Sequence, residues 1–270
     1  MPDTKKITIA EYKKKKASEL IQNADIIFCL DFNTYSRIGI LQEWVQKSHA
    51  IKILIDHHQQ PDDFDFICSD THIPATSQMI YHFIDALEQT HLVNEEIAQC
   101  LYTGIMTDTG GFRYRSTSAI THKIIAELIE KGANPAEISS NTWDNNTISR
   151  LKLLSLVLGR IELTKNNSAA ILWLKRDELL EFGFEKGDTD GFVNYGLSLF
   201  GVEVSALFIE DLYEDFIKIS FRSKNDADVN QFARKFFNGG GHINAAGGKY
   251  HKSMEETISD FKNILKNYDF

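Results

Sequence analysis

Short apolar runs alternate with helix-like stretches along the first half of the chain. The runs IIFCL (26–30), IKILI (51–55) and DFICS (65–69) are each about the length of a strand. Continuous apolar runs of this kind are typical of strands buried on both faces of a parallel sheet. Segments with apolar residues at helical spacing predict helices at 11–24, 36–46, 76–89 and 94–106. This alternation predicts an α/β domain built on a parallel sheet.

The second half of the chain has a different pattern. Residues 148–160 are apolar at helical spacing and could join two domains. Asn166 and Asn167 stand between two strand-like runs, which indicates a β-hairpin. The other predicted elements are an antiparallel strand pair at 202–209 and 214–222 and helices at 190–199, 228–237 and 254–267. The expected organisation is a parallel-sheet domain at 1–147, a connecting helix at 148–160 and a smaller α+β domain at 161–270.

Composition argues against some kinds of binding partner and indicates a cellular compartment. The net charge is 29 − 38 = −9 over 270 residues, which argues against a protein that coats long duplex DNA or an anionic membrane. Cys29, Cys68 and Cys100 form no C-x-x-C pair, so a disulfide framework is not expected and a reducing cytoplasm fits. No apolar run reaches about 18 residues, and the basic start lacks an apolar segment, so neither a membrane span nor a signal peptide is expected.

Two aspartates follow two of the predicted strands. Asp31 comes directly after the first strand, and Asp56 ends the second and is followed by His57 and His58. Ligands of open parallel sheets bind outside the carboxyl ends of the strands, so these side chains are expected to converge on one crevice. A lone Asp-His-His could also be a polar turn, and Asp31 alone could be a helix cap or turn residue.

A third group of polar residues follows the helix predicted at 94–106. In YTGIMTDTGGFRYRSTS (102–118), Asp108 stands where the predicted helix ends before two glycines. The guanidinium groups of Arg113 and Arg115 can form paired hydrogen bonds with phosphate oxygens. A capped helix end with a solvated basic loop is the alternative reading. Phe112 and Tyr114 flank Arg113 and could stack on a base.

A glycine-rich segment lies near the end of the chain. Five of the ten residues at 239–248 are glycines, and His242 stands among them. Glycines let backbone N–H groups approach an anion, although a glycine-rich turn before a strand is the alternative. Arg222, at the end of a predicted strand, could reach the same place. Trp143, Trp173 and Phe200, by contrast, are expected in the core.

Together these elements favour metal-assisted phosphate chemistry. Mg²⁺ and Mn²⁺ prefer carboxylate oxygens, and Mn²⁺ also accepts imidazole. Paired metals about 3.5–4 Å apart activate water and stabilise both oxygens of an in-line phosphoryl displacement. The set of aspartates and histidine fits such a site, and arginine and histidine from the second domain would hold the substrate phosphate.

These motifs resemble those of the DHH phosphoesterases, in particular the RecJ-like branch. That branch contains bacterial oligoribonucleases that degrade nanoRNA and phosphatases of 3′,5′-bisphosphate nucleotides (pAp). The segment LDFNTYSRIG resembles the second metal motif, IDHH the third and TGIMTDTGGFRY the fourth. FRS together with GGGHINAAGG resembles the DHH-associated, substrate-binding C-terminal domain. The resemblance runs from Asp25 to Gly248.

The resemblance implies roles for residues of the first domain. Asp31 would bridge two metals, His57 would bind one of them and Asp108 would be the last ligand. His58 would face the substrate phosphate, and Asp56 would orient the loop. Mn²⁺ is the implied metal, and Mg²⁺ is also possible.

Other implied roles concern the substrate. Arg222 and His242 match residues that grip the substrate from the second domain, with Gly240 and Gly241 beside them. Arg113 is a weaker match to a residue near the phosphate.

One departure from the family pattern concerns the first metal motif. A pattern like H-x-N-P-D-x-D is expected on a first strand, but only Asp3 and Asp25 and no histidine precede Asp31. The chain is expected to lack about 60–80 residues of the usual N-terminus. One metal would then keep three of its four protein ligands and the other only Asp31. The resulting hypothesis is weak binding of a single metal and impaired two-metal catalysis.

The predicted function is therefore a manganese-dependent phosphoesterase that acts on short RNA and pAp. The alternatives are a non-catalytic nucleotide-binding protein and a cyclic-dinucleotide phosphodiesterase of the same superfamily. A pyrophosphatase is disfavoured, because that branch resembles a different C-terminal domain. The expected partners are short RNA or nucleotides, and a homodimer stays open.

Overall fold

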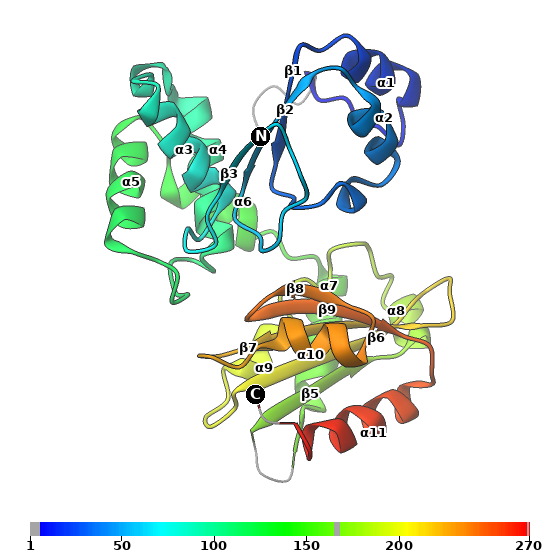
Figure 1. Cartoon of the computed structure of the whole chain (residues 1–270). Coiled ribbons are helices and arrows are strands. Elements are labelled where there is room, and N and C mark those ends of the chain that lie inside the picture. The colour runs from blue at the N-terminus through cyan, green and yellow to red at the C-terminus, as the bar shows by residue number, and fades with distance from the viewer. Residues whose placement is uncertain (1–5, 165–167, 269) are drawn as a thin grey trace. The chain divides into compact units, whose positions relative to one another are not determined.

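The computed structural model describes residues 6–164, 168–268 and 270. The chain divides into two compact units, Met1–Asp144 and Asn145–Phe270, which are described here one at a time (Figure 1). The helix predicted as a connector at 148–160 forms α7 (Ile148–Gly159) and is counted with the second unit. No helix in the described part of the chain is long and apolar enough to span a membrane.

The first unit is built on a parallel sheet of three strands. They are β1 (Ile26–Leu30), β2 (Ile51–Asp56) and β3 (Phe66–Ser69), in the order β1-β2-β3. Leu30 pairs with Ile55, so β1 and β2 end at the same edge of the sheet. This register places Asp31 and Asp56 side by side, as the sequence predicts.

Helices surround this sheet, and some of them differ from the predicted ones. The helix predicted at 36–46 is broken at Gly39, whose φ of 53° lies in the left-handed region. A helix after Ser118 was not predicted, although the Ser118 side chain caps it by accepting from the N–H of Thr121. The helices of the unit are α1 (Lys14–Gln22), η2 (Tyr35–Leu41), α2 (Gln42–Lys47), α3 (Thr76–Ala86), η3 (Thr90–Leu92), α4 (Glu95–Asp108), α5 (Ala119–Glu130) and α6 (Pro135–Trp143).

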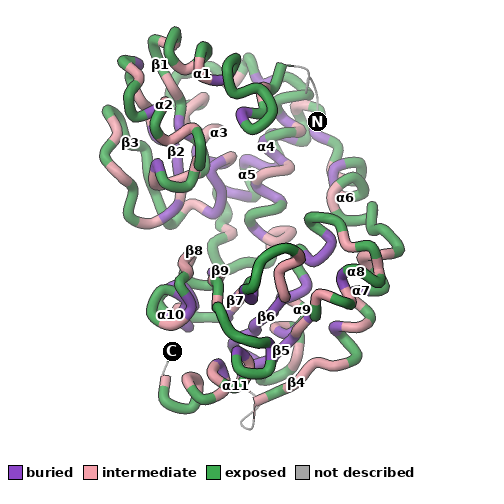
Figure 2. The backbone as a smooth tube through the Cα atoms, turned by 90° about the vertical axis from the view of Figure 1, so that its right-hand side faces the viewer, coloured by how far each residue is buried: buried purple, intermediate pink, exposed green. Residues whose placement is uncertain are grey.

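The prediction that these strands are buried on both faces is wrong for β1 and β3. On β1, Cys29 is buried in a cluster with residues of α1, η2 and α2, but Ile26 and Phe28 on the opposite face are 50% and 47% exposed. That face meets α3 through an edge-to-face contact between Phe28 and Phe83. All four residues of β3 are exposed (Figure 2).

The second unit contains a mixed sheet in the order β4-β5-β6-β7-β9-β8. Strands β5 and β6 are parallel, and the other neighbouring pairs are antiparallel. The strands are β4 (Glu162–Leu163), β5 (Ala169–Leu174), β6 (Val204–Glu210), β7 (Ile217–Ser223), β8 (Gly240–His242) and β9 (Ala245–Tyr250), and the helices besides α7 are α8 (Arg176–Glu181), α9 (Val193–Leu197), α10 (Val229–Phe236) and α11 (Met254–Leu265).

Helices pack against both faces of this second sheet. One face holds a cluster of fully buried phenylalanines from the sheet, α10, α11 and the segment after α10, and the other face packs against α7, α8 and α9. Strands β4 and β5 form the predicted antiparallel pair, whereas the turn residues Asn166 and Asn167 lie outside the described residues. The glycine-rich segment forms the hairpin of β8 and β9 and is not a loop.

Candidate metal centre and phosphate-binding face

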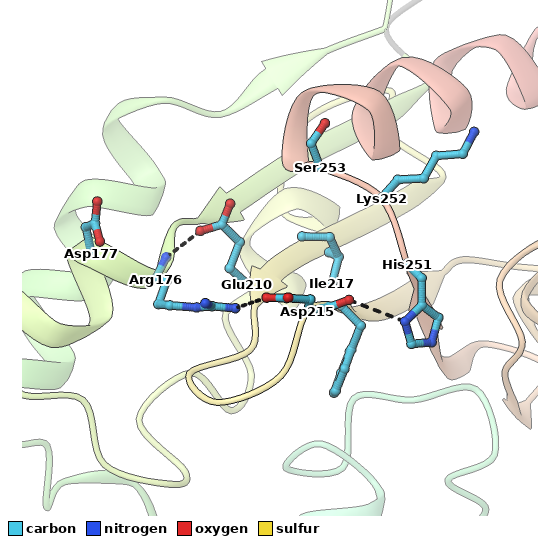
Figure 3. Close-up of a pocket in the computed structure, with 9 residues that line it drawn as sticks. Arg176, Asp177, Glu210, Asp215, Ile217, His251, Lys252 and Ser253 are labelled. Atoms are coloured by element: carbon cyan, nitrogen blue, oxygen red, sulfur yellow. Dashed lines mark hydrogen bonds and ion pairs between the residues drawn. The ribbon is translucent and has the colours of Figure 1, made fainter.

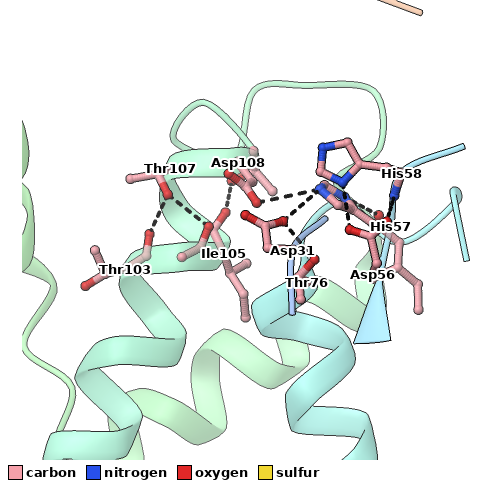
Figure 4. A network of polar contacts seen from close by, with 12 residues as sticks. Asp31, Asp56, His57, His58, Thr76, Thr103, Ile105, Thr107 and Asp108 are labelled. Atoms are coloured by element: carbon pink, nitrogen blue, oxygen red, sulfur yellow. Dashed lines mark hydrogen bonds and ion pairs between the residues drawn. The ribbon is translucent and has the colours of Figure 1, made fainter. Parts of the chain in front are cut away.

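Three side chains of the first unit converge at the ends of three elements. Asp31 follows β1, His57 follows β2 and Asp108 ends α4. One possible ligand atom from each of them lies within 4.8 Å of the others, and Figure 4 shows the two carboxylates beside the imidazole. The His57 Nε2 atom is 3.7 Å from Asp31 Oδ1 and 3.9 Å from Asp108 Oδ2. The structure thus brings together the three residues predicted as metal ligands.

Backbone geometry and hydrogen bonds orient these side chains. Asp31 has a φ of 64°, a left-handed conformation that is uncommon for a residue other than glycine. The Thr76 hydroxyl, at the start of α3, donates to Asp31 Oδ1 over 2.9 Å. The His57 Nδ1 atom lies 3.2 Å from the carbonyl oxygen of Ile73. That contact fixes the ring and leaves Nε2 facing the two carboxylates.

Thr76 and Ile73 were not predicted as part of the site. Thr76 is 5% exposed and is separated from Asp31 by 45 residues of sequence. Its position at the start of a predicted helix was the available signal, but nothing in the local pattern shows which carboxylate its hydroxyl reaches. The contribution of Ile73 comes from its backbone, which the sequence does not single out.

Asp56 and His58 form a tight pair next to this group. Asp56 is completely buried, and its carboxylate accepts from the His58 backbone N–H at 2.9 Å and contacts His58 Nδ1 at 2.7 Å. Burial acts to raise the pKa of Asp56, but the hydrogen bonds and charge of His58 outweigh it, and the pKa lies below its usual value. Asp56 is therefore a carboxylate whose two oxygens are engaged by His58.

Asp108 has the opposite electrostatic environment. Burial raises the pKa of Asp108 to about 6, and the negative charge of Asp31 adds to the rise, while His57 and His58 oppose it. Two carboxylates this close repel each other, and a bound cation would remove that repulsion. The two carboxylate oxygens and one imidazole nitrogen are a donor set that suits a divalent ion such as Mn²⁺ or Mg²⁺.

Arg113 lies in the loop that follows Asp108. Its side chain is exposed, and its Nε–H donates to the carbonyl oxygen of Gly110 over 2.8 Å. Phe112, which was expected to be available for stacking, is partly buried and packs edge-on against Tyr102 at 6.0 Å between ring centroids. The expectation that Trp143 lies in the core is wrong, because it is 44% exposed. Phe200, in the second unit, is fully exposed and also departs from that expectation.

In the second unit, strand pairing places Arg222 and His242 in one row. Arg222 on β7 pairs with Ala245 on β9, and Ala245 in turn pairs with His242 on β8. Paired residues of neighbouring strands point to the same face of a sheet, so the two side chains share a face and are separated by one alanine. Two strand spacings are about 10 Å. This face therefore combines a guanidinium and an imidazole over a floor of small residues.

The glycines next to His242 allow close backbone packing. A Cβ on Gly241 would lie 2.4 Å from the carbonyl oxygen of Ala245, so a larger residue does not fit there. The Gly241 N–H donates to Asn230 Oδ1 over 2.9 Å and is thus already used within the unit. Gly240 pairs with Gly247 in the same hairpin. The sequence predicted that the backbone N–H groups of this segment could bind an anion. The Gly241 N–H does not fit that prediction, because it already donates to Asn230.

A separate hollow of about 490 Å³ lies at the opposite end of β7 (Figure 3). Its charged groups are engaged with one another: Arg176 contacts Asp215 at 3.3 Å, and the Arg176 backbone N–H donates to Glu210. His251 Nδ1 lies 3.3 Å from the Asp215 carbonyl oxygen. These contacts within the hollow occupy its charged groups, so it is not offered as a phosphate site.

Comparison with known proteins matches both units. Residues 4–105 match the model of the DHH family, N-terminal domain, and residues 166–268 match that of the DHHA1 domain. A crystal structure of an exopolyphosphatase-related protein from Bacteroides fragilis is 38% identical, with a TM-score of 0.95 over 99% of this chain and 78% of that one. The chain belongs to the DHH family. The resemblance and the fold class predicted from the sequence are thereby confirmed.

Named relatives of this DHH protein cover most of its length. A Bacillus subtilis protein named bifunctional oligoribonuclease and PAP phosphatase NrnA is 28% identical over 226 residues, which are 82% of this chain and 70% of that protein. A probable protein of the same name from Streptococcus mutans is 28% identical over 274 residues, covering 97% of this chain and 85% of that one. The chain is accordingly a phosphoesterase, and hence a hydrolase, as the sequence predicts.

Proposed function

We propose that this DHH phosphoesterase uses Mn²⁺ to hydrolyse short oligoribonucleotides (nanoRNA) and 3′,5′-bisphosphate nucleotides (pAp). The observation that carries the proposal is the convergence of Asp31, His57 and Asp108 within 4.8 Å. The names of the two NrnA relatives support the choice of substrates. Mg²⁺ could take the same place, because it accepts the same oxygen ligands.

Asp31, His57 and Asp108 would hold the cation. A divalent ion in such a site lowers the pKa of a bound water and neutralises charge on a phosphoryl oxygen. Thr76 keeps Asp31 in position, and the carbonyl of Ile73 keeps His57 Nε2 turned toward the carboxylates. These three ligands make one cation site, so we propose one bound cation per chain.

His58 and Asp56 would serve the substrate. Asp56 engages His58 Nδ1, and we assign Nε2 of the same ring to contact with a phosphate oxygen, to which it donates when the ring is protonated. Buried Asp56 fixes the tautomer and the direction of the ring. We assign His58 to contact with the phosphate and Asp56 to the orientation of His58.

Arg222 and His242 would bind a substrate phosphate from the second unit. A guanidinium forms charge-assisted, bidentate hydrogen bonds with phosphate oxygens, and an imidazole adds a further donor. Gly240 lies on the same face as His242 and leaves it open because it carries no side chain, whereas Gly241 allows the close approach of β9. Arg113 is a further candidate for phosphate contact. The acidic net charge of −9 favours short substrates over long duplex DNA, and a cytoplasmic location stays a prediction.

Hydrolysis assays with Mn²⁺ test this proposal. The substrates are pAp, a 5′-phosphorylated RNA dinucleotide and a cyclic dinucleotide, with products separated by chromatography. We expect turnover of the first two and its loss in the double variant Asp31→Ala, His57→Ala. Preference for the cyclic dinucleotide would favour the alternative phosphodiesterase. Binding of pAp by folded protein without turnover would show a nucleotide-binding protein and refute the hydrolase assignment.

A further inference from the structure

Two aromatic rings lie directly on the backbone of the loop that follows Asp108. A Cβ added to Gly110 would come within 2.5 Å of the Tyr114 ring, and one added to Gly111 within 2.9 Å of the Trp143 ring. Both glycines also have positive φ, 58° and 73°. Glycine is thus required at both positions, by conformation and by space. The consequence is a pair of rings seated on two successive glycines.

The loop on which these rings pack is tied to the end of α4 by hydrogen bonds. Thr109 is fully buried, its hydroxyl donates to the Ile105 carbonyl at 2.7 Å and it accepts from the Phe112 N–H at 3.0 Å. The Gly111 N–H donates to the Met106 carbonyl at 2.8 Å. These bonds fix the backbone on which the rings rest.

Although each ring covers a glycine, both stay accessible. Tyr114 is 43% exposed and Trp143 is 44% exposed. Phe112, between Gly111 and Arg113 in the same loop, turns inward instead. The loop thus buries Phe112 and leaves Tyr114 exposed, and α6 adds the exposed ring of Trp143 beside it. Large exposed rings of this kind suit a flat partner.

The surface lies close to the candidate metal centre along the chain. Gly110 and Gly111 are two and three residues after Asp108, so their Cα atoms lie within about 8 and 11 Å of the Asp108 Cα. Arg113 is folded back onto the carbonyl of Gly110. The segment that follows Asp108 carries Arg113 and Tyr114, and Trp143, the last residue of α6, packs on Gly111 in this segment. A proposed metal ligand, a guanidinium and two exposed rings therefore surround one short segment, and together they suit the phosphate and the base of a nucleotide.

We propose that Tyr114 and Trp143 form a stacking surface for the nucleobase of a nucleotide whose phosphate is bound at the cation site of Asp31, His57 and Asp108. The inference rests on the proposed function and adds how the base is bound. Stacking on ring faces tolerates every base. The surface therefore predicts binding of nucleotides with little preference for base identity.

Binding of a non-hydrolysable product tests this inference separately from turnover. AMP and ribose 5-phosphate share the phosphate and the sugar and differ in the base. With Mn²⁺ present, calorimetry on the full chain is expected to show AMP binding about 10-fold more tightly, which corresponds to about 1.4 kcal/mol. The Tyr114→Leu, Trp143→Leu double variant is expected to lose that difference, whereas Tyr114→Phe keeps it.

Fluorescence provides a second readout. In a Trp44→Phe, Trp173→Phe background, AMP is expected to quench Trp143 saturably, and ribose 5-phosphate is not. Equal affinity for the two ligands, or an unchanged preference in the double variant, would overturn the stacking surface. If AMP binds as expected but no substrate is hydrolysed, the proposed function fails and the stacking surface stands. Unchanged melting of the variants controls for folding.

Discussion

The two units place their functional groups in different ways. In the second unit, Arg222 and His242 are aligned by the regular pairing of three strands whose other face covers a phenylalanine core. In the first unit, the candidate metal centre is assembled from the ends of separate elements, and the sheet keeps exposed apolar residues. A site set by strand register depends on the fold as a whole, whereas a site set by loop ends depends on a few hydrogen bonds.

The difference in burial gives the largest expected effect on stability. Phe221 on β7 is fully buried among other phenylalanines, and Phe28 on β1 is 47% exposed. We expect Phe221→Ala to lower the free energy of unfolding by about 3–5 kcal/mol and Phe28→Ala by about 1 kcal/mol or less. Chemical denaturation of both variants measures this. Equal losses would contradict the contrast between the two sheets.

Removal of the Arg222 guanidinium tests whether the second unit binds the substrate while the first unit binds the metal. Arg222→Ala is expected to raise KM for pAp by about 10–100-fold, because a charge-assisted hydrogen bond to phosphate contributes about 1.5–3 kcal/mol. Mn²⁺ affinity should be unchanged, since the proposed ligands lie in the first unit. Arg222→Lys should recover part of the loss. An equal fall in Mn²⁺ affinity would contradict separate roles for the two units.

In the first unit, a single hydrogen bond to a proposed metal ligand is expected to have a smaller effect. Thr76→Val removes the donor to Asp31 while keeping the shape of the side chain. We expect Mn²⁺ affinity measured by calorimetry to fall about 10-fold, the lower end of the range for an outer contact of a metal ligand. Thr76→Ser, which keeps the hydroxyl, is the matched control. If both variants bind Mn²⁺ like the original chain, Thr76 does not position Asp31.

The smallest expected effect concerns an ion pair in the second unit. Arg160 donates to both carboxylate oxygens of Glu178 at 2.6 Å. Burial acts to raise the pKa of Glu178, but the bonds from Arg160 and Lys175 outweigh it and the pKa is lowered. The folded state then binds the proton less readily than the unfolded chain. The ion pair therefore stabilises the fold at pH values above the ordinary glutamate pKa of about 4.3. This stabilisation is lost as the pH falls through the lower pKa of Glu178 in the folded state.

Comparison with Glu178→Gln measures that contribution. At pH 7 we expect the variant to unfold with about 1 kcal/mol less free energy, and the difference should shrink as the pH falls below about 4. Denaturant titrations at several pH values provide the test. A difference that grows toward acid pH would have the wrong sign.

The sequence predicted the elements that carry strong local signals. Strands β1 and β2 were placed closely because each is a continuous apolar run that ends next to an aspartate. The strand ends gave Asp31 and His57, the end of the predicted helix gave Asp108, and the resemblance to the DHH family joined the three as one ligand set. The hairpin of β8 and β9 was missed because glycines carry no hydrophobic period, and its strands are set by close backbone approach.

Contacts between residues far apart in the sequence could not be predicted from the local pattern of apolar and polar residues. Thr76 reaches Asp31 across 45 residues, and its role depends on how α3 packs beside β1. Trp143 was expected in the core because large aromatic side chains are usually buried, yet it rests on Gly111 with 44% of its surface exposed. The hydrogen-bond partner of Thr76 and the exposure of Trp143 are set by tertiary packing and not by the spacing of apolar residues in the sequence.

The central claim is that Asp31, His57 and Asp108 form a cation site. Calorimetric titration of the metal-free protein with Mn²⁺, compared with Asp31→Ala and with Arg222→Ala, tests it most directly. We predict one bound Mn²⁺ per chain, lost in Asp31→Ala and kept in Arg222→Ala. Binding that survives Asp31→Ala would contradict the site, and two tight Mn²⁺ ions per chain would contradict the single-cation hypothesis.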